Sequence, residues 1–228
     1  AIAVSIGGML SGIFVLPGLA VGITGSSVWL AFLVAALCIL PAVLSKSELG
    51  TAMPKSGGTY VYIERAFGPL FGTIAGIGLW LSLLLKSAFS LVGLSAYLYV
   101  VVNIDEAYTK AIALLALLLI FLLNVFGLKK VEKTQLFIVS VSIISLIVII
   151  ALGLTSFDTK LTEPVFSDGT NGFIAGVAFL YISYAGVTKI AAVAGEIKNP
   201  SKNLPLTMII SLFLITTIYS VSYTHLTL

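Results

Sequence analysis

Two stretches of small residues interrupt apolar segments in which a membrane helix would otherwise be continuous. One runs from Gly7 to Gly18, with Gly7, Gly8 and Gly12 close together, and the other from Ser183 to Gly186. Each glycine costs a helix about 1 kcal/mol relative to alanine, and backbone groups freed at membrane depth must line a cavity or bind a ligand. Free N–H groups at a helix amino end suit a carboxylate, and free carbonyls at a carboxyl end suit an ammonium. A site that offers both ends matches a zwitterion such as an amino acid.

Glycines in membrane helices also serve close helix packing, so the second stretch taken alone leaves both interpretations open. Interruptions at corresponding positions in two halves of a chain favour a substrate site. The two stretches correspond if the chain is an inverted repeat in which each opens a set of five helices. We therefore predict that both helices are broken and that the breaks form one site.

Lys86 lies at the centre of a third apolar segment. A lysine at that depth costs about 2.5–3.5 kcal/mol on insertion scales and marks a functional hypothesis by default. We predict that Lys86 is a proton-responsive coupling group or a fixed cation that biases the site towards anionic ligands. The alternative is a lysine bonded to helix carbonyls that only holds the bundle together. Lys189 follows the second stretch by three residues, and the sequence leaves open a solvated role, a gate pairing with Glu64 or Glu196, and a role at the substrate.

The composition is that of an integral membrane protein in contact with lipid. Of the 228 residues, 59% are hydrophobic and 9% are charged, with a mean hydropathy of +1.17, whereas soluble domains carry about 25% charged residues. The net charge of +3 is scattered, which argues against a nucleic-acid partner. With one cysteine and one histidine, no Cys/His cluster can form, so we expect no metal site, and no cofactor is implied.

Apolar runs of about 20 residues predict membrane spans. Seven occur, at about 1–23, 28–49, 69–102, 110–128, 135–155, 172–195 and 204–222. The connections on one side carry eight lysines and arginines: Lys46, Lys55, Arg65, Lys129, Lys130, Lys133, Lys198 and Lys202. The opposite side carries only Lys110 and Lys160. The positive-inside rule then places the N-terminus in the cytoplasm and the protein in the cell membrane as a multi-pass protein.

The predicted cytoplasmic loop 52–68 has structure of its own. Pro54 and the pair Gly57-Gly58 predict a turn, and 59–67 predicts a short interfacial helix. This loop is either a solvated connector or part of a cytoplasmic gate.

Three separated motifs resemble the amino acid–polyamine–organocation (APC) superfamily, and its prokaryotic amino acid permeases most closely. They are SGIF at 11–14, ELGTAMPKSGGTYVYIERAFGP at 48–69, and EIKNP at 196–200 followed by NLP at 203–205. The resemblance implies an all-α membrane protein with a LeuT-like fold, a five-plus-five inverted repeat with two further helices. The chain would then be one incomplete permease domain, 1–228, of about seven transmembrane helices with broken first and sixth helices. Residues 1–155 would form the first repeat and 172–228 the start of the second.

The resemblance also implies a set of substrate-binding residues. Ser11 and the amide of Gly12 would hold a carboxylate, and the carbonyls of Gly8, Ile182 and Ala185 would receive an ammonium. The same pocket would be lined by Met9, Leu10, Ile13, Ser183, Tyr184 and Gly186. The sequence departs from the family pattern where Leu10 replaces a glycine and where Ser142 replaces the lysine of certain proton-coupled members.

The function implied is a secondary transporter, not an enzyme, that moves amino acids by alternating access through proton-coupled symport or exchange. A polyamine or other organic cation carrier is the first alternative, and a seven-span receptor is a second of a different class. An intramembrane hydrolase would need clustered acids, or a serine and a lysine that converge on one point at membrane depth. The neighbours Lys86 and Ser87 on one helix do not converge. A homo-oligomer is compatible with the sequence. We further expect that the start of the chain is missing and that 222–228 is an assembly artefact.

Overall fold

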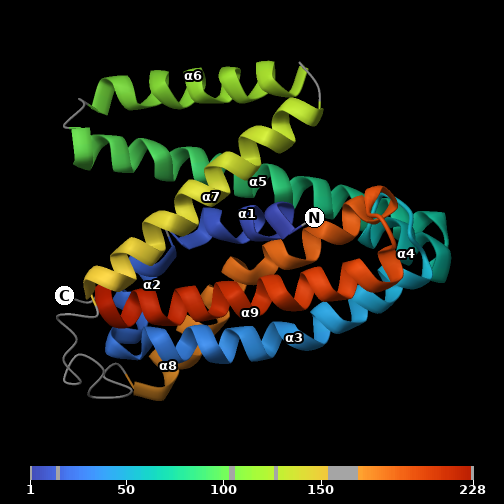
Figure 1. Ribbon diagram of the computed structural model, residues 1–228, viewed down its shortest axis with the longest axis horizontal. Coiled ribbons are helices and arrows are strands. Elements are labelled where there is room, and N and C mark those ends of the chain that lie inside the picture. Colours follow the sequence, from blue (N-terminus) through green and yellow to red (C-terminus); the bar gives the residue numbers. More distant parts are fainter. Residues whose placement is uncertain (1, 14–15, 103–105, 126–127, 154–168, 227–228) are drawn as a thin grey trace.

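The computed structural model describes residues 2–13, 16–102, 106–125, 128–153 and 169–226, and within these ranges every regular element is a helix (Figure 1). The elements are α1 (Ile2–Ile13), α2 (Leu16–Thr24), η1 (Gly25–Ser27), α3 (Val28–Ala52), α4 (Thr59–Phe67), α5 (Pro69–Val102), α6 (Glu106–Val125), α7 (Leu128–Gly153), α8 (Gly169–Tyr184), η4 (Ala185–Glu196) and α9 (Pro200–Leu226). Predictions on Ala1, Lys160 and 227–228, and on side chains at 11–13 and 222–226, fall outside the described parts.

The helices are those of a multi-pass membrane protein. Among the described residues, Leu19–Ala52, Pro69–Tyr99, Gly169–Glu196 and Pro200–Val221 are long and apolar enough to cross a membrane. They match four of the seven predicted spans. The predicted spans at 110–128 and 135–155 coincide with the shorter apolar stretches Lys110–Val125 and Lys133–Val148, and the first span is divided between α1 and α2. The inverted repeat and the cytoplasmic N-terminus stay predictions.

The core forms where α3 packs against α8 and α9 (Figure 1). Ala31 and Ala35, one turn apart on α3, are fully buried, and their small side chains let the neighbouring helices approach closely. Leu204 and Met208 of α9 are buried as well. By contrast, the apolar side chains of α5 and α6 are mostly exposed, and the two helices form a separate layer along the upper edge of Figure 1. This exposed apolar surface suits contact with lipid.

The first predicted stretch, Gly7–Gly18, contains the end of α1 and the start of α2. Gly7, Gly8 and Gly12 all lie inside α1, which ends at Ile13, and α2 begins at Leu16. Gly7 and Gly8 serve close packing. A Cβ on Gly7 would lie 2.9 Å from Nε2 of Gln135 on α7, and one on Gly8 would lie 3.2 Å from Cα of Gly186.

The second predicted break is confirmed as the point where regular α-helix ends. α8 stops at Tyr184, inside the predicted stretch, and the chain continues as the 3₁₀ helix η4 from Ala185. η4 also contains a kink at Val193, whose φ of −110° and ψ of 22° are not helical. Runs of 3₁₀ helix longer than three or four residues are uncommon, and a long one inside a helix often marks a hinge.

The loop before α4 is docked on η4. The helix predicted at 59–67 is confirmed as α4. Gly57 and Gly58 have φ values of +126° and +55°, and the amide of Gly57 donates a hydrogen bond of 2.9 Å to the carbonyl of Ala192. A Cβ on Gly58 would lie 3.1 Å from Cα of Ala192. The loop is therefore joined to the segment that follows the second break and is more than a solvated connector.

Candidate functional site

The two stretches singled out in the sequence meet where α1 crosses the start of η4. Gly8 and Gly186 face each other there, and a Cβ on Gly186 would overlap the backbone of Gly8 and Met9. Only glycine fits at this distance. Because α8 ends at Tyr184 and η4 begins at Ala185, Gly186 at the crossing lies two residues beyond the end of the α-helix.

Two lysines, one on α5 and one on η4 itself, flank the same crossing. Nζ of Lys86, on α5, donates a hydrogen bond of 3.0 Å to the carbonyl of Gly8. Cδ of Lys189, on η4, lies 3.3 Å from the position of a Cβ on Gly8. Both lysines are half-buried. If Lys86 only holds the bundle together, it should bond to a helix carbonyl, and the bond to Gly8 is such a contact. Gly8 is also a predicted substrate-binding residue, so both interpretations of Lys86 stay open.

A third lysine reaches η4 from α3. Nζ of Lys46 donates a hydrogen bond of 3.3 Å to Oγ1 of Thr188, and Oγ1 of Thr188 donates one of 3.2 Å to the carbonyl of Ala185. Lys46 was predicted to be a loop lysine, and this contact was not predicted. Its place inside the apolar run 28–49 was the signal that could have revealed it.

A cluster of three aromatic side chains is attached to the segments that form the crossing. The rings of Phe32, Tyr184 and Tyr219 lie 5.0–6.3 Å apart between centroids. The hydroxyl of Tyr219 donates a hydrogen bond of 2.8 Å to the carbonyl of Met9, and that of Tyr184 donates one of 3.1 Å to the carbonyl of Phe32. The cluster therefore ties α1 to α9 and α8 to α3. Sequence reasoning missed Phe32 and Tyr219, because nothing local distinguishes them from other apolar-segment aromatics.

The remaining predicted site residues are placed as follows. Met9, Leu10, Ser183 and Tyr184 are buried, and Oγ of Ser183 has no hydrogen-bond partner among the described residues. The side chains of Ile182 and Ala185 are exposed. Ser11, Gly12 and Ile13 form the last turn of α1. Their roles in substrate binding stay predictions.

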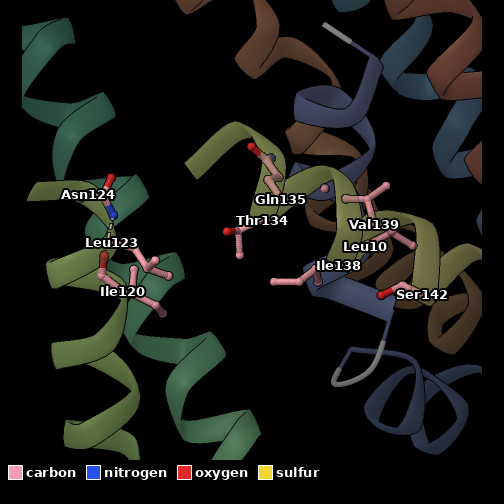
Figure 2. Close-up of a pocket in the computed structure, with 10 residues that line it drawn as sticks. Leu10, Ile120, Leu123, Asn124, Thr134, Gln135, Ile138, Val139 and Ser142 are labelled. Carbon is pink, nitrogen blue, oxygen red and sulfur yellow. Dashed lines mark hydrogen bonds between the residues drawn. The ribbon is translucent and has the colours of Figure 1, made fainter. Parts of the chain in front are cut away.

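A cavity of about 400 Å³ lies on the side of α1 that faces α6 and α7 (Figure 2). It is lined by Gly7, Leu10, Ile120, Leu123, Asn124, Thr134, Gln135, Ile138, Val139 and Ser142. Most of this lining is apolar. The amide of Asn124 donates to the carbonyl of Ile120 in its own helix. Ser142, which the resemblance matched to a coupling lysine of other permeases, belongs to this cavity and not to the Gly8–Gly186 crossing.

Comparison with known proteins points to one class. The sequence model of a family described as amino acid permease matches residues 1–223. The chain is 29% identical over 216 residues to the serine/threonine exchanger SteT of Bacillus subtilis, covering 92% of this chain and 49% of that protein. It is 29% identical over 244 residues to the branched-chain amino acid permease BcaP of Lactococcus lactis, covering 96% and 52%.

A plant relative extends the comparison. The chain is 26% identical over 230 residues to the chloroplastic cationic amino acid transporter 7 of Arabidopsis thaliana, covering 90% of this chain and 39% of that protein. The chain thus spans about half the length, or less, of the curated relatives it matches.

Proposed function

This chain belongs to the amino acid permease family of the APC superfamily, and from that premise we propose that the protein is a secondary transporter that moves amino acids across the cell membrane by alternating access. The family and the relatives are transporters, not enzymes. Since the family match covers residues 1–223, the seven-span receptor is set aside.

The contact between Gly8 and Gly186 is the observation that carries the proposal. It joins α1 to the point at which α8 gives way to η4, so peptide groups from both segments lie together. We place the substrate at this crossing. Ser11 and the Gly12 amide hold its carboxylate, the carbonyls of Gly8, Ile182 and Ala185 receive its ammonium, and the pocket is completed by Met9, Leu10, Ile13, Ser183, Tyr184 and Gly186.

The loop that docks on η4 is proposed as part of the cytoplasmic gate. Its hydrogen bond from Gly57 to Ala192 attaches it to the segment that follows the hinge at Ala185. Movement of η4 would carry the loop with it and change access from the cytoplasm. This assignment requires the N-terminus to be cytoplasmic, as the distribution of loop lysines predicts.

Two modes of coupling remain in the proposal, proton symport and amino acid exchange. Lys86 is the coupling candidate because its ammonium contacts the carbonyl of Gly8 directly. A change in that contact would alter the proposed site and the link between α5 and α1 together. One relative is named an exchanger, which supports testing exchange alongside symport.

The test is uptake of radiolabelled amino acids by proteoliposomes that contain the protein encoded by the complete gene. Uptake driven by an inward proton gradient indicates symport, and uptake only into vesicles preloaded with amino acid indicates exchange. Gly186→Val should abolish either activity, because its side chain would overlap the backbone of Gly8.

Gly78→Val is the matched control, because Gly78 lies on α5 with no atom within 4 Å of its Cβ position among the described residues. No transport of any amino acid under either condition would contradict the proposal and favour the organic cation carrier.

A further inference from the structure

The Gly8–Gly186 crossing collects three lysines from three segments. Lys86 bonds to the carbonyl of Gly8, and the stem of Lys189 passes beside the same residue. Lys46 bonds to Thr188, the neighbour of Lys189 in the chain. We call Lys46, Lys86 and Lys189 the lysine cluster. All three side chains are half-buried, inside segments that are otherwise apolar.

The acceptors of these ammonium groups are neutral. Lys86 bonds to a peptide carbonyl and Lys46 to a hydroxyl. No member of the cluster forms an ion pair with a carboxylate of the described residues. Lys86 and Lys189 both lie beside Gly8, where their like charges repel each other. Like charges that are partly desolvated and lack a counter-charge attract an anion strongly, because the local dielectric is low.

The same contacts disfavour a second positive charge on the substrate. The carbonyls of Gly8 and Ala185, which the proposed site assigns to the α-ammonium of the substrate, also accept hydrogen bonds from Lys86 and Thr188, so little acceptor capacity is left for a second ammonium. A substrate with an ammonium side chain would meet three like charges and no carboxylate. A substrate with a carboxylate side chain would meet donors that can form charge-assisted hydrogen bonds.

We infer that the lysine cluster selects amino acids with an acidic side chain, such as glutamate and aspartate, over their neutral amide counterparts. This inference rests on the proposed function, since it names the substrate class of the same site. Lys86 and Lys189 contact the crossing itself and contribute most. Lys46 acts through Thr188 and contributes less.

The experiment measures inhibition of amino acid uptake in proteoliposomes by L-glutamate and by L-glutamine, which are nearly the same size and differ in charge. The selectivity ratio is the concentration of glutamine that halves uptake divided by the concentration of glutamate that does so. For the unmodified protein we expect this ratio to be at least ten. Lys86→Met and Lys189→Met should each reduce that ratio by tenfold or more, and Lys86→Arg should keep most of it. Lys202→Met, at an exposed position on α9, is the control and should leave the ratio unchanged.

Each outcome decides between the two proposals. If glutamine and glutamate inhibit uptake at equal concentrations, this inference is overturned and the proposal of amino acid transport is left intact. A preference for glutamate that survives all the lysine variants overturns the role of the cluster. No amino acid transport at all overturns both. The ratio in the unmodified protein tests the inference even if one variant fails to fold.

Discussion

The hydroxyl of Tyr219 reaches from α9 to the carbonyl of Met9 and so links the position of α1 to one side chain. Tyr219 is fully buried, and its ring packs on Phe32 at 5.0 Å between centroids. Replacing the hydroxyl by hydrogen removes the bond and keeps the packing. The side chain therefore allows the polar contribution to be measured apart from the apolar one.

We predict that Tyr219→Phe destabilises the protein by about 1–3 kcal/mol, the cost of leaving a buried acceptor without its donor. The measurement is the melting temperature in detergent, taken from the fraction of protein that stays monodisperse on size-exclusion chromatography after heating. Tyr99→Phe is the control, because Tyr99 is 55% exposed on α5 and should change little. An equal melting temperature for both variants would show that the bond to Met9 carries no stability.

For Lys86, the cost of burying the charge offsets the gain from its hydrogen bond. Insertion of a lysine at membrane depth costs about 2.5–3.5 kcal/mol, and a hydrogen bond from a charged group returns about 1.5–3 kcal/mol. The two nearly cancel, so we predict that Lys86→Met folds at least as stably as the unmodified protein. Equal or higher thermal stability in detergent, combined with altered substrate selection, would separate function from folding. A clear loss of stability would instead indicate that Lys86 mainly holds α5 to α1.

At the scale of elements, glycines decide which segments touch. Gly186 lets η4 reach the backbone of α1, whereas Gly78 faces open space on α5. We predict that Gly186→Ala destabilises the protein by about 1–3 kcal/mol through overpacking. Gly78→Ala should stabilise it by up to about 1 kcal/mol, because alanine is the better helix former. Melting temperatures of the two variants measure the difference. If both variants shift the melting temperature in the same direction, the close contact between Gly186 and α1 is contradicted.

The loop on η4 offers a second matched pair of glycines. Gly58 and Gly68 both have positive φ, +55° and +88°, but only Gly58 faces the backbone of Ala192. Alanine at either position should cost about 1–3 kcal/mol of backbone strain. We predict that only Gly58→Ala also slows transport, because only that Cβ pushes the loop off η4. Initial uptake rates, normalised to folded protein, measure this, and equal rates for the two variants would argue against the gate.

At the scale of the whole molecule, the lysine distribution predicts which face is cytoplasmic. Cys38 is the only cysteine of these 228 residues, so Cys38→Ser removes their thiol background. Into this variant we would introduce Lys55→Cys, in the loop on η4, or Lys110→Cys, at the other end of the bundle. We predict that a membrane-impermeant maleimide in intact cells labels Lys110→Cys only, and that Lys55→Cys is labelled in inside-out vesicles. The reverse pattern would overturn the orientation.

The apolar runs and the turn residues in the sequence predicted the positions of several helices. The run predicted at 69–102 is α5 with the same limits, and the helix predicted at 59–67 is α4. Helix ends were less certain, since α9 begins at Pro200 where the apolar run begins at 204. Proline favours the first turn of a helix, which the hydropathy pattern does not weigh.

The sequence by itself determined that this is a helical membrane protein, which segments are apolar, and that Gly8, Lys86 and Gly186 are unusual where they stand. Those properties are local, since they depend on composition and on neighbours along the chain. Only the tertiary structure decided that Gly8 lies in a continuous helix and touches Gly186, that Lys86 bonds to Gly8, and that Lys46 belongs to the same place. Such contacts join residues far apart in sequence, and no local pattern specifies what a missing Cβ or a buried ammonium will face.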